Sequence, residues 1–318
     1  MHPVVKLVAE RLAIGVVLLL AVSALIFLGV NMLPGDVAQS ILGQSATAES
    51  LANLREELGL NQPPLTRYFQ WLWGILHGDL GKSLTNGQDI ATEIGSRLGN
   101  TLFLAFWAAI IAVPLAISLG LLAVRYRNRW PDKLISGVTL ATISLPEFVV
   151  GYILMYLLSV KFRIFSPIST LNDGMSLGQE LYAIAIPVMV LVLVVLAHMM
   201  RMTRAAILNV MQSAYVETAE LKGLRPLAVI ARHALPNAVA PVVNVVMLNL
   251  AYLVVGVVVV EVVSVYPGMG QYLVDHVAKR DLPVVQACGL IFAAVYICLN
   301  ILADVISILS NPRLRHPK

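Results

Sequence analysis

Charged residues are scarce in this chain. Only 13% of its 318 residues are Asp, Glu, Lys or Arg, whereas about a quarter are charged in soluble globular domains. Hydrophobic residues make up 58%, and the mean hydropathy is +0.82. This balance excludes an ordinary water-soluble domain and indicates a protein that crosses a membrane several times.

Cysteine is almost absent. Cys288 and Cys298 are the only two, and on one helix they would lie about 15 Å apart along the axis, which excludes a disulfide between them. We expect both to be packing residues. No cluster of His and Cys has the spacing of metal ligands, and no pair of nucleophile and base is apparent, so the sequence predicts neither a metal site nor a catalytic residue.

Six uncharged or nearly uncharged runs are long enough to cross a hydrocarbon core, which needs about 20 apolar residues. The first follows Lys6 and Arg11 and could be a signal peptide, but its apolar run is longer than usual and no small-x-small cleavage site follows. We therefore predict an all-α polytopic membrane protein with six transmembrane helices. The predicted spans are residues 12–33, 98–123, 134–160, 181–200, 237–262 and 283–308.

The positions of Lys and Arg predict the orientation, because these residues are enriched in cytoplasmic loops. With the N-terminus inside, fourteen of the twenty-two fall on the cytoplasmic side. Both termini and the loop at 215–236 are then cytoplasmic, and residues 34–96 form the one substantial segment outside. This bias also accounts for the net charge of +4, so no nucleic-acid partner is implied.

The outer segment contains an aromatic run at 65–77, including Tyr68 and Trp71. Trp and Tyr favour the membrane interface, so this stretch is either a helix along the outer surface or a helix packed on the other spans. Farther on, residues 78–83 partly match a phosphate-binding loop. That loop requires Gly five positions before its Gly-Lys pair, but Leu76 stands there, so no nucleotide site is predicted.

A polar island between two apolar spans carries a fixed spacing. Glu217 is followed by Ala219, by Gly223 four positions later, and by Leu235 and Pro236 twelve and thirteen positions after that. Ser213 can cap a helix, Gly223 can end it in a left-handed conformation, and Pro226 can start the next. This pattern favours a short rigid knob, with an ordinary amphipathic loop as the alternative.

Glu147 is a carboxylate deep in an apolar run. It is fourteen residues from both Lys133 and Lys161, or about 20 Å along a helix, which is beyond easy snorkelling. Such an acid is costly unless it is paired, hydrated or protonated. It could meet a cationic group of a substrate, or hydrogen-bond to a neighbouring helix, for example to His198. Pro146 removes a backbone donor and can open the helix there.

Three separated blocks carry a family resemblance. The first comprises residues 33–36, 54–60 and 78–84, the second is the loop at 215–236, and the third comprises 260–261, 266–270 and 311–313. Over nearly its whole length the chain resembles a permease subunit of the dipeptide and oligopeptide class of ABC importers. Two departures are His233, which hardly affects the assignment, and Glu147, which leaves the substrate in doubt.

The resemblance implies the fold of a type I ABC importer permease, with an extracytoplasmic segment after the first helix. Residues 1–96 would hold the first helix and the periplasmic or interfacial segment, 97–310 the transmembrane core with its coupling loop at 213–236, and 311–318 a cytoplasmic tail. It places the chain in the lipid of a bacterial inner membrane. It also implies a homologous second permease, an extracytoplasmic substrate-binding protein, and two ATPase subunits that bind ATP and Mg²⁺, so this chain would be non-catalytic and hold no cofactor.

The polar island is similar to the cytoplasmic loop that docks such permeases into a groove on an ATPase. The coupling candidates are Tyr215, Glu217, Ala219, Glu220, Lys222, Gly223, Arg225, Leu235 and Pro236. The pathway or substrate candidates are Glu147, Glu261 and Tyr266. Residues 266–270 predict a turn at the outer surface, which either lines the face for the binding protein or simply caps the span.

Peptides are the cargo that the resemblance implies, with nickel chelates, opine-like compounds and oligosaccharides as the alternatives. Two other classes of protein remain open. An ion-coupled secondary transporter would also carry buried acids, but such proteins commonly have inverted repeats, which the sequence does not show. A channel or a scaffold would have no need of the spaced loop.

Overall fold

The computed structural model describes residues 3–32, 37–42, 46–57, 59–172 and 174–310. The predicted blocks at 33–36 and 311–313 and the predicted tail at 311–318 lie outside the described residues. Within these ranges the chain is helical, and its one β-type contact is an isolated bridge between Lys82 and Asp89. The all-α prediction is confirmed for the part of the chain that is described.

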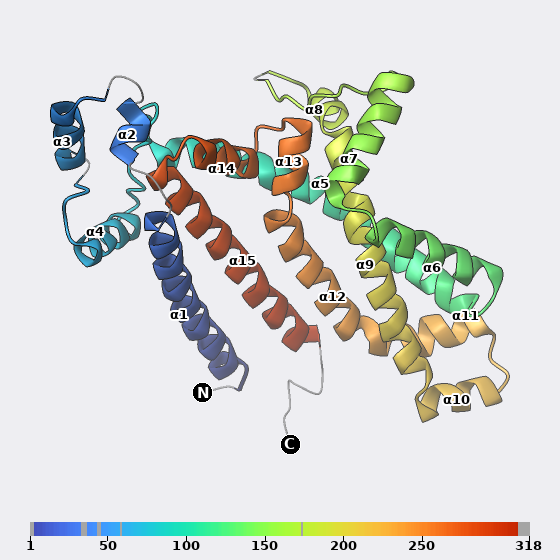
Figure 1. Ribbon diagram of the computed structural model, residues 1–318. Coiled ribbons are helices and arrows are strands. Elements are labelled where there is room, and N and C mark those ends of the chain that lie inside the picture. Colours follow the sequence, from blue (N-terminus) through green and yellow to red (C-terminus); the bar gives the residue numbers. More distant parts are fainter. Residues whose placement is uncertain (1–2, 33–36, 43–45, 58, 173, 311–318) are drawn as a thin grey trace.

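The helices fall into long ones and short ones (Figure 1). The long helices are α1 (Pro3–Asn31), α5 (Ile90–Arg125), α9 (Ala185–Met211), α12 (Leu235–Val255) and α15 (Leu282–Ser310). The short ones are α2 (Val37–Leu42), α3 (Ala48–Glu57), α4 (Pro64–Leu76), α6 (Trp130–Ile143), α7 (Glu147–Met155), α8 (Leu177–Ala183), α10 (Ala214–Leu221), α11 (Pro226–Val229), α13 (Val258–Ser264) and α14 (Met269–Ala278). Two π-helical turns, Tyr156–Lys161 and Ile230–Ala234, follow α7 and α11.

Five helical segments among the described residues are long and apolar enough to cross a membrane, and one bent pair of helices makes a sixth if it counts as one span. The five segments are Val8–Asn31, Ile90–Arg125, Ala185–Met211, Pro226–Val255 and Leu282–Ile306. The six predicted runs overlap these segments and the bent pair. Their ends differ, most of all for the run predicted at 237–262: its span is Pro226–Val255, and residues 258–262 belong to the separate helix α13.

The third predicted span is wrong as a continuous helix. Residues 134–160 are divided between α6 and α7, and the two parts meet at an angle of 101°. Pro146 precedes α7 directly, and the residue before a proline is driven out of the helical conformation. Glu147 therefore lies in the first turn of α7 rather than in the middle of a straight helix.

The centre of the bundle is the contact between α5 and α9. Small residues repeat every four positions along α5, at Ala108, Ala112, Ala116 and Gly120, and all are buried. A Cβ atom at Gly120 would lie 3.0 Å from a methyl carbon of Thr203 on α9. Small side chains at this spacing let two membrane helices approach closely, which explains why α5 and α9 form the core on which other elements pack.

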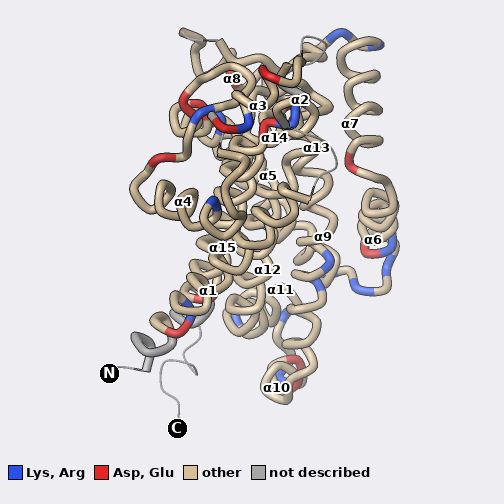
Figure 2. Tube along the Cα trace, turned by 60° about the vertical axis from the view of Figure 1, so that its left-hand side comes forward, with Lys and Arg blue, Asp and Glu red and all other residues tan. Residues whose placement is uncertain are grey.

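The two ends of the molecule are formed by different helices. The start of α1, the end of α15 and the α10–α11 region lie toward one end, and α2, α3, α8, α13 and α14 lie toward the other (Figure 1). Charged residues gather at these ends, with few in the helices between them (Figure 2). The arrangement matches a membrane belt whose middle holds few charges, Glu147 among them.

Helix α1 rests on α15 at the side of the bundle. Gly15 and Gly289 lie at the contact, where added Cβ atoms would be 2.8 Å from Ile301 and 3.2 Å from Ile26. Cys288 is buried, whereas Cys298 is exposed, so the packing prediction holds only for the first cysteine.

Helix α4 forms where a helix was predicted at 65–77, and it shows the packing on another span that was one of the two predicted placements. One side packs on α1, where the hydroxyls of Tyr68 and Ser23 are 2.8 Å apart and the ring of Tyr68 meets Phe27 edge-on at 5.4 Å. The other side is apolar and exposed, with Phe69 and Trp73 uncovered. This face suits the membrane interface.

Candidate functional site

The polar loop folds as a helix, a break and a second helix. Gly223 adopts a φ of 77°, which is the left-handed conformation predicted for it, and Pro226 takes the first position of α11 as predicted. Ser213 occupies the cap position of α10, but its hydroxyl donates back to the carbonyl of Val210 and does not cap the helix. That detail of the prediction is wrong, because the side chain closes the preceding turn.

The two short helices hold each other through a small apolar cluster. Val216 and Ala219 of α10 are buried against Val229 of α11, with Met211 of α9 alongside. Ala219 therefore positions the knob from inside. The other candidates of the knob present exposed side chains or backbone to the surroundings: Tyr215, Glu217, Glu220, Lys222, Gly223 and Arg225.

The knob is joined directly to a membrane span. Helix α11 continues through the π-helical turn Ile230–Ala234 into α12, and the whole stretch Pro226–Val255 qualifies as one 30-residue span. Leu235 is partly buried against the core at this junction, and Pro236 is exposed. A displacement of the knob can therefore reach α12 without crossing a flexible linker.

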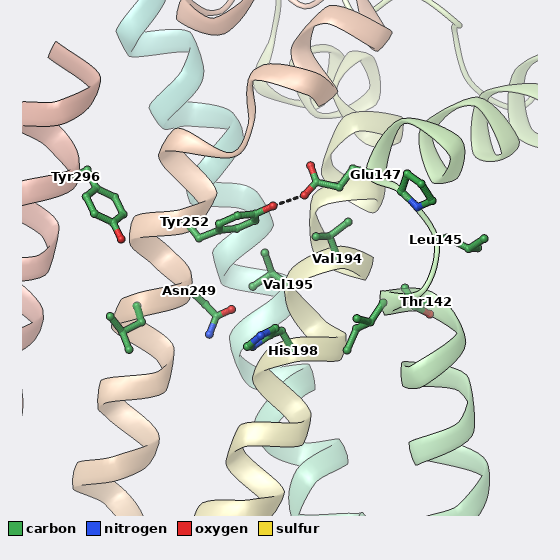
Figure 3. Close-up of a pocket in the computed structure, with 12 residues that line it drawn as sticks. Thr142, Leu145, Glu147, Val194, Val195, His198, Asn249, Tyr252 and Tyr296 are labelled. Carbon is green, nitrogen blue, oxygen red and sulfur yellow. Dashed lines mark hydrogen bonds between the residues drawn. The ribbon is translucent and has the colours of Figure 1, made fainter. Parts of the chain in front are cut away.

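A cavity of about 640 Å³ opens where α6 breaks from α7. Its walls come from the break itself and from α9, α12 and α15. Figure 3 shows Glu147 and Tyr252 reaching toward each other across it, with Asn249 and His198 nearby. The Tyr252 hydroxyl donates a hydrogen bond to Oε1 of Glu147. The structural partner of Glu147 is thus Tyr252, and His198 shares the cavity.

Glu261 lies away from this cavity and is fully buried. Its carboxylate accepts the Thr101 hydroxyl at 2.6 Å and the backbone N–H groups of Gly270 and Gln271 at 2.7 and 3.2 Å. The N–H of Met269 donates to the Thr101 oxygen at 2.8 Å. The first three amides of α14 are thereby satisfied, so Glu261 works as the N-terminal cap of that helix.

The turn predicted at 266–270 forms between α13 and α14, and Tyr266 is buried within it. The Tyr266 hydroxyl donates to the carbonyl of Asn100 at 2.8 Å, and the Asn100 amide donates to the carbonyl of Pro267 at 2.8 Å. These reciprocal bonds tie the turn to α5. The Tyr266 side chain anchors the turn from within and is not part of an exposed surface.

Comparison with known proteins decides the family. The family model described as "Binding-protein-dependent transport system inner membrane component" matches residues 112–316, and the model for the N-terminal part of such components matches residues 4–105. The chain belongs to this family. It is a membrane permease subunit of an ABC importer.

Relatives of this permease cover it almost completely. It is 36% identical over 310 residues to the glutathione transport system permease protein GsiC of Escherichia coli O6:H1, covering 97% of this chain and 98% of that protein. The corresponding protein of Salmonella paratyphi A is 37% identical over 312 residues, with the same coverage. A solved structure of the MetNI methionine ABC transporter in inward-facing conformations shares the fold, with a TM-score of 0.50 and 16% identity over 70% of this chain and 96% of that chain.

The permease also has an anchor that sequence reasoning missed. Asp281 is fully buried between α14 and α15. It accepts the hydroxyls of Ser83 and Thr85 at 2.6 and 3.0 Å and the N–H groups of Leu84 and Thr85 at 3.2 Å each. The segment that partly matched a phosphate loop therefore leads into a turn that is fixed to the residue just before α15. No local pattern marks a partner almost 200 positions away.

Asp89 closes the same turn and starts α5. Its carboxylate accepts the N–H of Thr92 at 2.9 Å and the Thr92 hydroxyl at 3.0 Å. These hydrogen bonds, the backbone one foremost, hold the pKa of Asp89 below its usual value. Helix α5 thus begins at a defined cap.

Proposed function

We propose that this permease forms half of a translocation pathway for small peptides, paired with a homologous second permease. Two ATPase subunits, which would hold ATP and Mg²⁺, would dock onto the loop at 213–236, and a binding protein outside would deliver the cargo. The observation that carries the docking role is the shape of the loop: two helices clamped by Val216, Ala219 and Val229 beneath exposed polar side chains. The peptide cargo rests on the relatives, which are described as glutathione permeases.

The proposed orientation places the knob and both termini in the cytoplasm of a bacterial cell. Two observations support it. Lys and Arg are concentrated in the loops assigned to that side, and the start of α1, the end of α15 and α10 share one end of the molecule (Figure 1). The family description as an inner membrane component supports the membrane.

The proposed stroke runs along α12. Closure of the ATPases would move the knob, and the continuous helix Pro226–Val255 would carry the movement into the span. Of the three pathway candidates, Glu147 lies on the cavity, whereas Glu261 and Tyr266 would keep the outer turn in place while the spans rock. The chain itself would perform no chemistry on ATP.

Gly223→Asp tests the docking role. A side chain at a φ of 77° is strained, and no atom lies within 4 Å of the added Cβ, so the change alters the knob without disturbing the core. Gly174→Asp is the matched control, since Gly174 has a φ of 87° and equally open surroundings. We expect Gly223→Asp to abolish binding-protein-stimulated ATP hydrolysis in the reconstituted complex, and Gly174→Asp to retain it. Wild-type stimulation in Gly223→Asp would exclude the loop as the docking site.

A further inference from the structure

The cavity beside Glu147 has an acidic side chain in its wall but no basic Lys or Arg among its described residues to balance it. None of the described residues that line it is Lys or Arg, and its polar groups besides Glu147 are hydroxyls, an amide and an imidazole. The rest of the wall is apolar, from residues such as Val194, Val195 and Leu248. With no Lys or Arg among these lining residues, the acid attracts a cation rather than an anion to the cavity.

The helix break adds to this preference. Thr142 and Ile143 at the end of α6 line the cavity, and the last carbonyl groups of a helix carry partial negative charge. Glu147 itself sits in the first turn of α7. The break therefore brings its carboxylate and the end of α6 to the same cavity.

In the structure, Tyr252 already engages one of the two carboxylate oxygens of Glu147. Its hydroxyl donates to Oε1 of Glu147, and it belongs to the helix that leaves the coupling loop. Tyr252 lies seventeen positions beyond Leu235, which is about 25 Å along α12. A movement of α12 relative to α7 would change this bond directly.

We propose that the cavity binds the ammonium group of the cargo, with Glu147 as its counter-ion and Tyr252 as the competing donor. The proposal rests on the proposed function and narrows the cargo to compounds with a free amine. A volume of about 640 Å³ falls within the range of small-molecule pockets. Displacement of α12 would withdraw the Tyr252 hydroxyl and strengthen the hold on the amine, and its return would release the cargo.

The test compares two probes that differ by one charge. Trialanine carries a free ammonium group, and N-acetyl-trialanine does not. Binding of each to the assembled permease and ATPase complex in nanodiscs, without binding protein, is measured by saturation-transfer NMR. We expect the wild type to bind trialanine about tenfold or more tightly than N-acetyl-trialanine, because hydrogen bonds to charged groups are stronger than those between neutral groups.

Three variants locate the effect. Glu147→Gln keeps the shape and should remove the preference, whereas Glu49→Gln, which neutralises an exposed acid of α3, should keep it. Tyr252→Phe removes the competitor and should tighten trialanine binding by up to about tenfold. Unchanged affinity in Tyr252→Phe would overturn the role of Tyr252 as competitor.

Two results would overturn amine binding. One is that Glu147→Gln and the wild type prefer trialanine over N-acetyl-trialanine by the same factor. The other is no saturation transfer to the wild type in a preparation whose ATP hydrolysis still responds to its binding protein, and that result would leave the proposed function intact. If the complex shows no such response, the proposed function is at fault, and the same probe comparison on the purified chain decides the amine site separately.

Discussion

At the scale of single residues, the turn between α13 and α14 depends on the absence of a side chain at two glycines. A Cβ at Gly268 would lie 2.1 Å from Oε1 of Glu261, and one at Gly270 would lie 2.6 Å from the Cα of Val258. Glu261 packs directly against this backbone, and this closeness lets it accept the amides of Gly270 and Gln271. Neither glycine has a positive φ, so space and not backbone conformation requires them.

Gly268→Ala should therefore destabilise the fold. The methyl group must displace a buried carboxylate, and overpacking of this kind costs about 1–3 kcal/mol. The measurement is thermal unfolding of the purified chain in detergent, followed by Trp fluorescence. Gly137→Ala is the control, because nothing lies within 4 Å of its added Cβ. Equal unfolding temperatures for the two variants would contradict the packing argument.

Asp281→Asn should loosen the turn at 83–87. An amide nitrogen cannot accept the donors that converge on the carboxylate from Ser83, Leu84 and Thr85, and hydrogen bonds to a charged group contribute about 1.5–3 kcal/mol each. A reporter cysteine at exposed Asn86 should react faster with a thiol reagent in this variant. Asp275→Asn, at an exposed position of α14, is the control. A reaction rate unchanged by Asp281→Asn would show that the anchor is not needed.

At the scale of elements, the knob is a pair of helices with a very small core. Ala219 is 5% exposed and fills the gap between α10 and α11. The stiffness that the proposed coupling requires thus depends on a contact of three or four side chains. A larger group at this position would separate the helices without touching the exposed polar surface.

Ala219→Leu should uncouple ATP hydrolysis from the binding protein. The added carbons have no space between α10 and α11, so the knob changes shape at a cost of about 1–3 kcal/mol. Ala214→Leu makes the same exchange at an exposed position of α10 and should remain coupled. Stimulated ATP hydrolysis is measured in the reconstituted complex for both. Full coupling in Ala219→Leu would show that the exposed side chains act without a fixed scaffold.

Sequence patterns predicted the elements that depend on local chemistry. The left-handed Gly223 and the Pro226 start follow from backbone restrictions within a few residues, and the spans follow from runs of apolar residues. The 101° bend was not predicted in size, although Pro146 marked its position. The sequence could not predict that Glu147 bonds to Tyr252 or that Asp281 bonds to Ser83. Both pairs depend on how segments far apart in sequence pack together.

At the scale of the whole molecule, the proposed orientation makes a prediction about accessibility. Asn86, Asn172 and Arg225 are all exposed. Single cysteines at these positions, in a background without Cys288 and Cys298, are treated with an impermeant thiol reagent in intact cells. We expect labelling at Asn86 and Asn172 and none at Arg225 until the cells are opened. The reverse pattern would place the knob outside and rule out docking to cytoplasmic ATPases.

The π-helical turn Ile230–Ala234, between α11 and α12, preserves the angular phase between the knob and the span. Such a turn holds one residue more than an α-helical path would need and takes it up within one wider turn, so the helices on either side keep almost the phase of an unbroken α-helix. A residue inserted between this turn and Tyr252 would have no such turn to absorb it, and would rotate the knob by about 100° relative to Tyr252. The wide turn thus keeps a push on the knob directed at the face of α12 that meets Glu147.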